Sequence, residues 1–309
     1  MSLISTVLGT INNTELGCCL MHEHLIASAA GIPQNYSDLL GKRFKERVIQ
    51  KLVEAKNGGI DTIVDATTVD LGRDVNFLIE ASRLTGINII TTTGWWLEAP
   101  YLLERVTSDH FTRIFIKEIK DGIADSGVKP GILKAASGMA GLTPRNEVIL
   151  RAVARTHLET KLPIMLHSYA PGQVGRQQLA VLKDEGVNLN RVAVDHCDDA
   201  DDLNYLIWMA NQGCYLGFDR FPHSDYPLPR VKALKEIINA GYATRILLSH
   251  DWSETDLILH AKDNKLIQNP YGYLYVKKVV LPILREMNVD EGILSSILTD
   301  NPRQFFGAE

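Results

Sequence analysis

Short apolar runs rich in β-branched residues recur along the whole chain, and each ends in a polar residue or a glycine. Eight of these runs have the length and composition of buried strands. They span residues 17–21, 61–65, 88–93, 131–136, 163–167, 191–195, 214–218 and 245–249. Their starts lie 23 to 44 residues apart, about the length of one strand-plus-helix unit.

Helical patterns occupy the intervals between these runs. Segment 146–155, for example, has apolar residues at positions 148, 149, 152 and 153, which is the spacing of one helix face. Thr143 is a candidate N-cap, and Pro144 would take the first helical position. Glycines such as Gly86 and Gly186 follow other helical patterns, where a left-handed cap is favoured.

Eight alternating strand–helix units without an internal linker indicate either a doubly wound sheet or a closed barrel. A doubly wound nucleotide-binding sheet would carry a glycine-rich fingerprint after an early strand, and the chain has neither this nor a P-loop. The sequence therefore predicts an α/β chain folded as one (β/α)8 TIM barrel domain over residues 1–309. Functional side chains are expected at the C-terminal ends of its strands.

Composition excludes several other classes of protein. The apolar content of 45% and charged content of 22% are those of a globular chain, and the net charge of −5 gives no reason to expect nucleic-acid binding. No apolar run approaches the roughly 18 residues of a membrane helix. The first basic residue is Lys42, too late for a secretory signal, and the four cysteines form no Cys-x-x-Cys pair. We expect buried thiols, no membrane contact and a cytoplasmic location.

Histidines and an aspartate end four of the predicted strands. His22 and His24 lie two residues apart at the end of the first, so both face one side of it. Alone, this pair could be two unrelated polar residues. However, His167, His196 and Asp251 end three further strands, and barrel closure brings all four ends around one cavity. Imidazole and carboxylate are ligands of divalent transition metals, so the sequence predicts a metal centre.

Lys134 distinguishes between kinds of metal centre. It interrupts the otherwise apolar strand 131–136, where an unpaired ammonium would be costly. It could extend from the strand end to water. Alternatively, a lysine of depressed pKa could react with carbon dioxide and become an anionic carbamate that bridges two metals. Mononuclear barrel deaminases use a similar histidine and aspartate set without this lysine, so Lys134 favours a two-metal hydrolase.

These residues resemble the bacterial phosphotriesterases and phosphotriesterase-like lactonases of the amidohydrolase superfamily, over essentially the whole chain. The resemblance rests on short motifs at the strand ends and one at the chain end. They are His22-Glu-His24, Thr62-Ile-Val-Asp65, Gly72-Arg-Asp74, Thr93-Gly-Trp-Trp96, Gly131-Ile-Leu-Lys134, His167, His196-Cys-Asp-Asp199, Leu216-Gly-Phe-Asp-Arg220, Ser249-His-Asp-Trp252 and Asn301-Pro-Arg-Gln-Phe-Phe306.

The resemblance implies a binuclear centre. His22, His24 and Asp251 would hold the more buried ion, and His167 and His196 the more exposed one. Lys134, as a carbamate, would bridge both ions together with a hydroxide that attacks the substrate. Asp251 would take the proton of that hydroxide. Zinc is favoured, although cobalt, manganese or iron would also fit these nitrogen and oxygen ligands. A homodimer is also implied.

Residues outside the metal-ligand set indicate the substrate class. Phosphotriesterases carry a proton-relay histidine after strand seven, whereas this chain has Arg220, as the lactonase branch does. His223 nevertheless resembles the phosphotriesterase version, and Arg220 could also be a surface ion-pair residue. Trp96 is the expected pocket wall, with Trp95 packed between helices. Asp199 resembles an acidic residue that the family carries beyond strand six, next to the metal ligands but not among them. Asp198-Asp199 could equally cap the next helix.

We therefore expect a hydrolase of lactones, such as acyl-homoserine lactones, with phosphotriesterase activity toward organophosphates. Its partners would be small-molecule ester, lactone or phosphotriester substrates. One alternative is a dedicated organophosphate triesterase, an aryldialkylphosphatase. The other is a non-catalytic, metal-containing barrel that binds a hydrophobic ligand. The complete set of six candidate ligands disfavours the second alternative, because binding alone does not require a bridging base.

Overall fold

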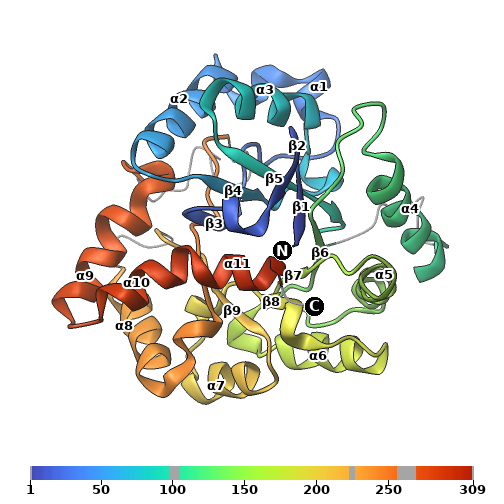
Figure 1. Cartoon of the computed structure of the whole chain (residues 1–309). Helices are drawn as coiled ribbons and strands as arrows, with labels where there is room; N and C mark the ends of the chain where they lie inside the picture. The colour runs from blue at the N-terminus through green and yellow to red at the C-terminus, as the bar shows by residue number, and fades with distance from the viewer. Residues whose placement is uncertain (1, 98–104, 223–226, 256–268, 308–309) are drawn as a thin grey trace.

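The computed structural model describes residues 2–97, 105–222, 227–255 and 269–307. Eight parallel strands form a nearly closed barrel surrounded by helices, which confirms the predicted fold (Figure 1). The predicted strand limits agree with the observed ones to within two residues. The barrel strands are β3 (Cys19–Glu23), β4 (Thr62–Asp65), β5 (Asn88–Gly94), β6 (Ile132–Ala136), β7 (Ile164–His167), β8 (Val192–Val194), β9 (Tyr215–Phe218) and β10 (Ile246–Leu248).

Helices follow the strands and cover the barrel. They are α1 (Ile32–Asn35), α2 (Phe44–Asn57), α3 (Val75–Thr85), α4 (Ser108–Asp121), α5 (Pro144–Thr160), α6 (Gly175–Asp184), α7 (Leu203–Asn211), α8 (Leu228–Ile237), α9 (Leu281–Glu286), α10 (Glu291–Leu298) and α11 (Asp300–Gly307). The predicted start of α5 is confirmed, because the Thr143 side chain accepts a hydrogen bond from the backbone N–H of Asn146. Among the described residues, no helix is long and apolar enough to span a membrane.

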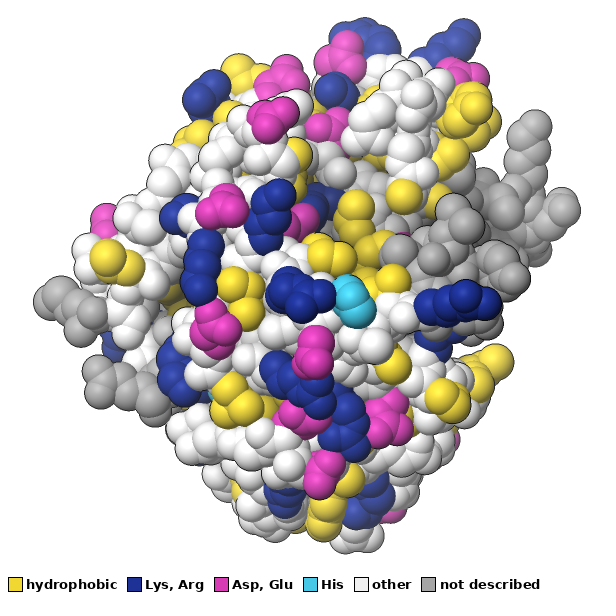
Figure 2. All heavy atoms as spheres, turned by 90° about the vertical axis from the view of Figure 1, so that its right-hand side faces the viewer, with side chains coloured by type: hydrophobic (Ala, Val, Ile, Leu, Met, Phe, Trp, Pro, Cys, Tyr) yellow, Lys and Arg dark blue, Asp and Glu magenta, His cyan; other side chains and the backbone are white. Residues whose placement is uncertain are grey.

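The outer face of α4, α5 and α6 carries charges of both signs (Figure 2). Arg155 links two of these helices, with Nη1 2.7 Å from the Asp109 carboxylate. Arg151 lies 2.8 Å from the Glu185 carboxylate, just beyond the end of α6. Exposed pairs of this kind stabilise a protein weakly. They mark this face as solvated.

A β-hairpin precedes the barrel, which the strand pattern did not predict. Strands β1 (Leu3–Thr6) and β2 (Gly9–Asn12) pair antiparallel. In Figure 1 the hairpin and α11 lie across the near end of the barrel, close to both chain termini. Ile4 packs there with Phe305 and Phe306 in the cluster that fills the barrel. The N-terminal end of the barrel is therefore covered by apolar side chains.

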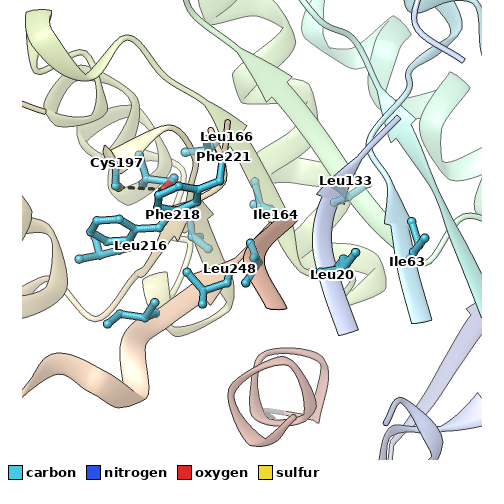
Figure 3. Packing of buried hydrophobic residues seen from close by; sticks show 14 of the residues in the cluster. Leu20, Ile63, Leu133, Ile164, Leu166, Cys197, Leu216, Phe218, Phe221 and Leu248 are labelled. Carbon is cyan, nitrogen blue, oxygen red and sulfur yellow. Dashed lines mark hydrogen bonds between the residues drawn. The ribbon is translucent and has the colours of Figure 1, made fainter. Parts of the chain in front are cut away.

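Alternation along the strands divides the core into two layers. Leu20, Leu133 and Leu216 face outward and pack beneath the helices (Figure 3). Inward residues such as Ile132 and Tyr215 fill the barrel. Because successive side chains alternate, the inward positions nearer the C-terminal strand ends include Lys134, two residues after Ile132. The strand pattern thus places polar groups above an apolar barrel floor.

The seam between β10 and β3 completes the barrel. No regular ladder joins these two strands within the described residues. Instead, the Asp251 N–H donates to the His22 carbonyl at 3.0 Å, and the His24 N–H donates to the Trp252 carbonyl at 3.0 Å. Closure at this seam therefore occurs where two of the predicted ligand motifs meet.

Candidate metal centre

The six predicted ligand residues lie together at the C-terminal end of the barrel. Lys134 Nζ lies 2.7 Å from His22 Nε2, and both side chains are almost fully buried. Asp251 Oδ1 lies 3.2 Å from His24 Nε2 and 3.4 Å from His22 Nε2. His196 joins the same group, with Nδ1 3.9 Å from Asp251 Oδ2. His196 Nε2 in turn lies 2.7 Å from His167 Nδ1, so strand ends far apart in sequence contribute to one cluster.

Two of these residues have left-handed backbone conformations. His196 has φ of 63° and Asp251 has φ of 50°. Such angles are costly for residues other than glycine and concentrate at functional sites. An extended strand would turn consecutive side chains to opposite faces, yet Asp195 and His196 both face the cluster. The left-handed turn at His196 is what allows this.

Two buried carboxylates lie behind the histidines, and sequence reasoning did not single them out. Asp219 Oδ1 lies 2.8 Å from His196 Nδ1, and its Oδ2 lies 3.0 Å from His22 Nδ1. One carboxylate therefore contacts two candidate ligands and directs the Nε2 atom of each away from itself. Asp195 Oδ2 also lies 3.0 Å from His22 Nδ1. The signal that could have found both is their position at the ends of two predicted strands.

The lack of a side chain at Gly217 leaves space for the carboxylates of Asp195 and Asp219. A Cβ atom built on it would lie 2.9 Å from Asp195 Oδ1 and 3.0 Å from Asp219 Oδ2. Its glycine identity is therefore explained by close packing against charged groups.

Burial and mutual charge shift the pKa values in the cluster. Burial lowers the pKa of Lys134, although Asp195 and Asp251 act in the opposite direction. Burial and Lys134 also act to lower the pKa of His22, but the carboxylates of Asp195 and Asp251 outweigh them and raise it to about 10. Burial would raise the pKa of Asp251, yet neighbouring histidines hold it well below its usual range. Burial, followed by His196, lowers the pKa of His167.

These shifts fit the short contact between Lys134 and His22. Two positive charges cannot share a contact this short, so at least one of the two groups is neutral when Lys134 Nζ lies 2.7 Å from His22 Nε2. The lowered pKa of Lys134 makes its amine easier to deprotonate than that of an exposed lysine.

The donor set fits divalent transition metals. Among the described residues, two groups place their ligand atoms within 4.8 Å of one another: His22 with His196 and Asp251, and His22 with Asp195 and Asp219. The buried Asp195 Oδ2 lies 3.0 Å from His22 Nδ1 without an aligned hydrogen bond, and Asp219 Oδ2 lies at the same distance, so two carboxylates at this nitrogen favour a cation nearby. Imidazole nitrogens and carboxylate oxygens suit zinc, cobalt, manganese or iron.

The two tryptophans after β5 have different surroundings. The Trp95 ring packs edge-on against Phe111 of α4, with ring centroids 5.8 Å apart. The Trp96 ring instead lies edge-on to His167, with centroids 5.9 Å apart. The Asp70 carboxylate accepts the backbone N–H of Trp96. Trp96 is therefore beside the candidate ligands, whereas Trp95 contacts the helix layer.

Arg220 lies at the edge of the cluster. Its Nε is 3.6 Å from Asp251 Oδ2, and its Nη1 donates to Asp199 Oδ2 at 2.8 Å. Arg230 contacts the other oxygen of Asp199 at 2.7 Å. The alternative in which Asp198-Asp199 caps the next helix is wrong, since Asp202 is the N-cap of α7. Asp199 instead holds Arg220. His223 lies outside the described residues.

A barrel with histidine, carboxylate and lysine side chains gathered at its C-terminal strand ends is typical of metal-dependent hydrolases. The chain belongs to the phosphotriesterase family, whose model matches residues 2–306, as the resemblance predicted. It is 35% identical to a phosphotriesterase homology protein of Mycobacterium tuberculosis, over 99% of this chain and 98% of that protein.

Two further similarities agree with this assignment. The aryldialkylphosphatase of Saccharolobus solfataricus is 31% identical, over 96% of this chain and 97% of that enzyme. The solved structure of the phosphotriesterase from Mycobacterium tuberculosis superposes with a TM-score of 0.90 at 33% identity. That superposition covers 99% of this chain and 98% of the other. The protein is thus a phosphotriesterase-like hydrolase.

Proposed function

We propose that this protein is a binuclear metal-dependent hydrolase that acts on lactones and, as a second activity, on organophosphate triesters. The observation that carries the proposal is the convergence of Lys134 with His22 and Asp251 at one point of the barrel. A buried lysine of lowered pKa beside histidine and carboxylate ligands is suited to a bridging role. A lysine that served only the fold would instead extend its ammonium to water.

Each ligand residue has a distinct task in this proposal. His22, His24 and Asp251 would hold one ion, and His167 and His196 would hold the other. In its unprotonated form the Lys134 amine would attack the carbon of carbon dioxide: an N–C bond forms, one C=O bond becomes a C–O⁻ bond, and a proton leaves to solvent. Lys134 as a carbamate would then help to hold both ions. When bound, the two ions would supply an acidified water and polarise the substrate oxygen.

Asp251 is placed to move the proton. Its carboxylate lies within 3.4 Å of both His22 and His24, and its depressed pKa keeps it ionised near neutral pH. An ionised carboxylate can accept the proton of the attacking water. Arg220 lies beyond it and, because arginine stays protonated, would orient a substrate rather than relay a proton.

The preference for lactones rests on Arg220 and Trp96. The guanidinium is held by Asp199 and has a buried Nε without a hydrogen bond, which leaves a donor directed toward Asp251. Such a donor suits the carbonyl or ring oxygen of a lactone. The Trp96 ring would form an apolar wall for an acyl chain.

The name of the Saccharolobus relative supports the second candidate, a dedicated aryldialkylphosphatase. Family membership is also the ground on which we propose zinc as the metal and a cytoplasmic homodimer. It likewise supports a single domain spanning residues 1–309.

Elemental analysis and a substrate panel test the proposal. Purified protein is expected to hold close to two transition-metal ions per chain, and chelation should abolish hydrolysis. Lactones should be turned over with higher kcat/KM than aryl triesters. The reverse order would favour the aryldialkylphosphatase. Two bound ions without turnover of either substrate would favour a binding protein. One ion with full activity would contradict the binuclear mechanism.

A further inference from the structure

The two ligand motifs at the barrel seam each contain residues that no proposed task uses. Glu23 lies between His22 and His24, and Ser249 and His250 precede Asp251. All three side chains are fully buried. Buried polar groups in proteins are nearly always hydrogen-bonded, so the partners of these three side chains indicate their role.

Glu23 and the Ser249–His250 pair bind each other across the seam. Glu23 Oε1 accepts from Ser249 Oγ at 2.7 Å and from the His250 backbone N–H at 3.0 Å. It also lies 2.5 Å from His250 Nδ1, and Glu23 Oε2 accepts the Trp252 N–H at 3.3 Å. Four donors directed at one side chain require it to accept at every contact, which is the property of a carboxylate. We call Glu23, Ser249 and His250 the seam network.

The orientation of the His250 ring follows from its other nitrogen. His250 Nε2 accepts the backbone N–H of Val276 at 3.0 Å, so this nitrogen carries no proton. Nδ1 therefore carries the proton and donates to Glu23. The seam network thus extends from Glu23 of β3 to the start of the final helical region.

The seam network also surrounds the strained residue that carries a candidate ligand. The backbone N–H groups of His250 and Trp252, on either side of Asp251, both donate to the Glu23 carboxylate. The N–H of Asp251 itself donates to the His22 carbonyl. These three bonds hold the left-handed backbone of Asp251, whose φ is 50°. Ser249 Oγ in addition accepts the His22 N–H at 2.8 Å.

We propose that Glu23 is a positioning residue that aims Asp251 at His22 and His24, and so builds one of the two metal positions. The inference rests on the proposed function for its metal. Glu23 contacts neither ion and acts only through the backbone on either side of Asp251. The metal position formed by His167 and His196 should not depend on Glu23, because neither histidine bonds to the seam network.

Glu23→Gln tests this inference with little change in shape. An amide can accept through its oxygen only, so at least one of the four donors would face its NH2 group. Hydrogen exchange of the metal-free protein, read by mass spectrometry, should accelerate over residues 249–252. Zinc titrated against a competing chelator should show about 10–100-fold weaker binding of one ion and near-normal binding of the other.

Thr156→Val is the matched control. Thr156 is buried on α5, remote from the seam, and its hydroxyl donates to the Ala152 carbonyl at 2.8 Å. Its loss removes one buried hydrogen bond without touching a ligand. Should Glu23→Gln fail to fold, Ser249→Ala removes one donor to Glu23 and should give a smaller change of the same pattern.

The outcomes separate this inference from the proposed function. Equal weakening of zinc binding at both metal positions would overturn the positioning role. So would amide exchange rates and zinc affinities equal to those of the Thr156→Val protein. Faster exchange with both affinities unchanged would overturn it as well. Wild-type protein that binds no zinc would instead contradict the proposed function, and the exchange measurement would still show whether Glu23 holds the Asp251 backbone.

Discussion

Replacing Gly217 by alanine would test whether the carboxylates behind the histidines set up the metal centre. The added Cβ would lie 2.9 Å from Asp195 Oδ1 and 3.0 Å from both Asp195 Cα and Asp219 Oδ2. Real Cβ contacts essentially never fall below 3.0 Å, and the β8 backbone next to Asp195 cannot move freely. The side chains of Asp195 and Asp219 must therefore give by a few tenths of an ångström, which would disturb their contacts with the imidazoles.

The expected magnitude has two parts. Overpacking by one methyl group in a filled core costs about 1–3 kcal/mol of folding free energy. Unfolding entropy is about 2.1 cal/mol/K per residue, or about 0.65 kcal/mol per degree for 309 residues. The unfolding temperature of the metal-free protein should then fall by about 2–5 °C. Displacing Asp219 from His22 and His196 should in addition weaken metal binding by about 10–100-fold.

Calorimetry of the metal-free protein and zinc titration measure these two effects separately. Gly138→Ala is the control, since Gly138 lies just beyond barrel strand β6 and its added Cβ would make only ordinary contacts with the described residues, the nearest at 3.5 Å from Leu97. The reasoning would be refuted if Gly217→Ala matched Gly138→Ala in both unfolding temperature and zinc affinity. Loss of stability with unchanged affinity would show that the carboxylates have no part in aiming the histidines.

Two further substitutions address Lys134 and Arg220. Lys134→Ala should lose one ion and most activity, with partial rescue by short-chain carboxylates that occupy the vacated bridge; elemental analysis showing both ions and a normal rate would make the lysine a bystander. Arg220→His should lower lactone kcat/KM and raise or preserve that for aryl triesters, by steady-state kinetics on both. A tenfold change in their ratio corresponds to about 1.4 kcal/mol of transition-state binding. Equal losses on both substrates would show that Arg220 supports its loop, through Asp199, rather than selecting the substrate.

The sequence alone was sufficient for the eight barrel strands, the barrel and the family, but not for the β1–β2 hairpin. Inward and outward residues alternate visibly along β6, where Leu133 packs under the helices and Ile132 fills the barrel. The C-terminal ends of parallel strands meet at one end of a barrel, so polar residues at those ends predict a common site without coordinates. Motifs such as His22-Glu-His24 then identified the family, because ligand residues must recur in a set order along the chain.

The partners of those residues depended on the tertiary structure. Alternation predicts only one inward residue of the pair Asp195-His196, whereas a left-handed turn brings both to the site. Gly217 has no local signal for its close packing against two carboxylates. Alternation along the first strand puts Glu23 only on the face opposite to its neighbouring histidines. That it binds His250, 227 positions away, follows from barrel closure, which sets β10 beside β3. Such contacts depend on which strand ends lie side by side in the folded barrel, and the residue pattern within a single strand does not predict its neighbour.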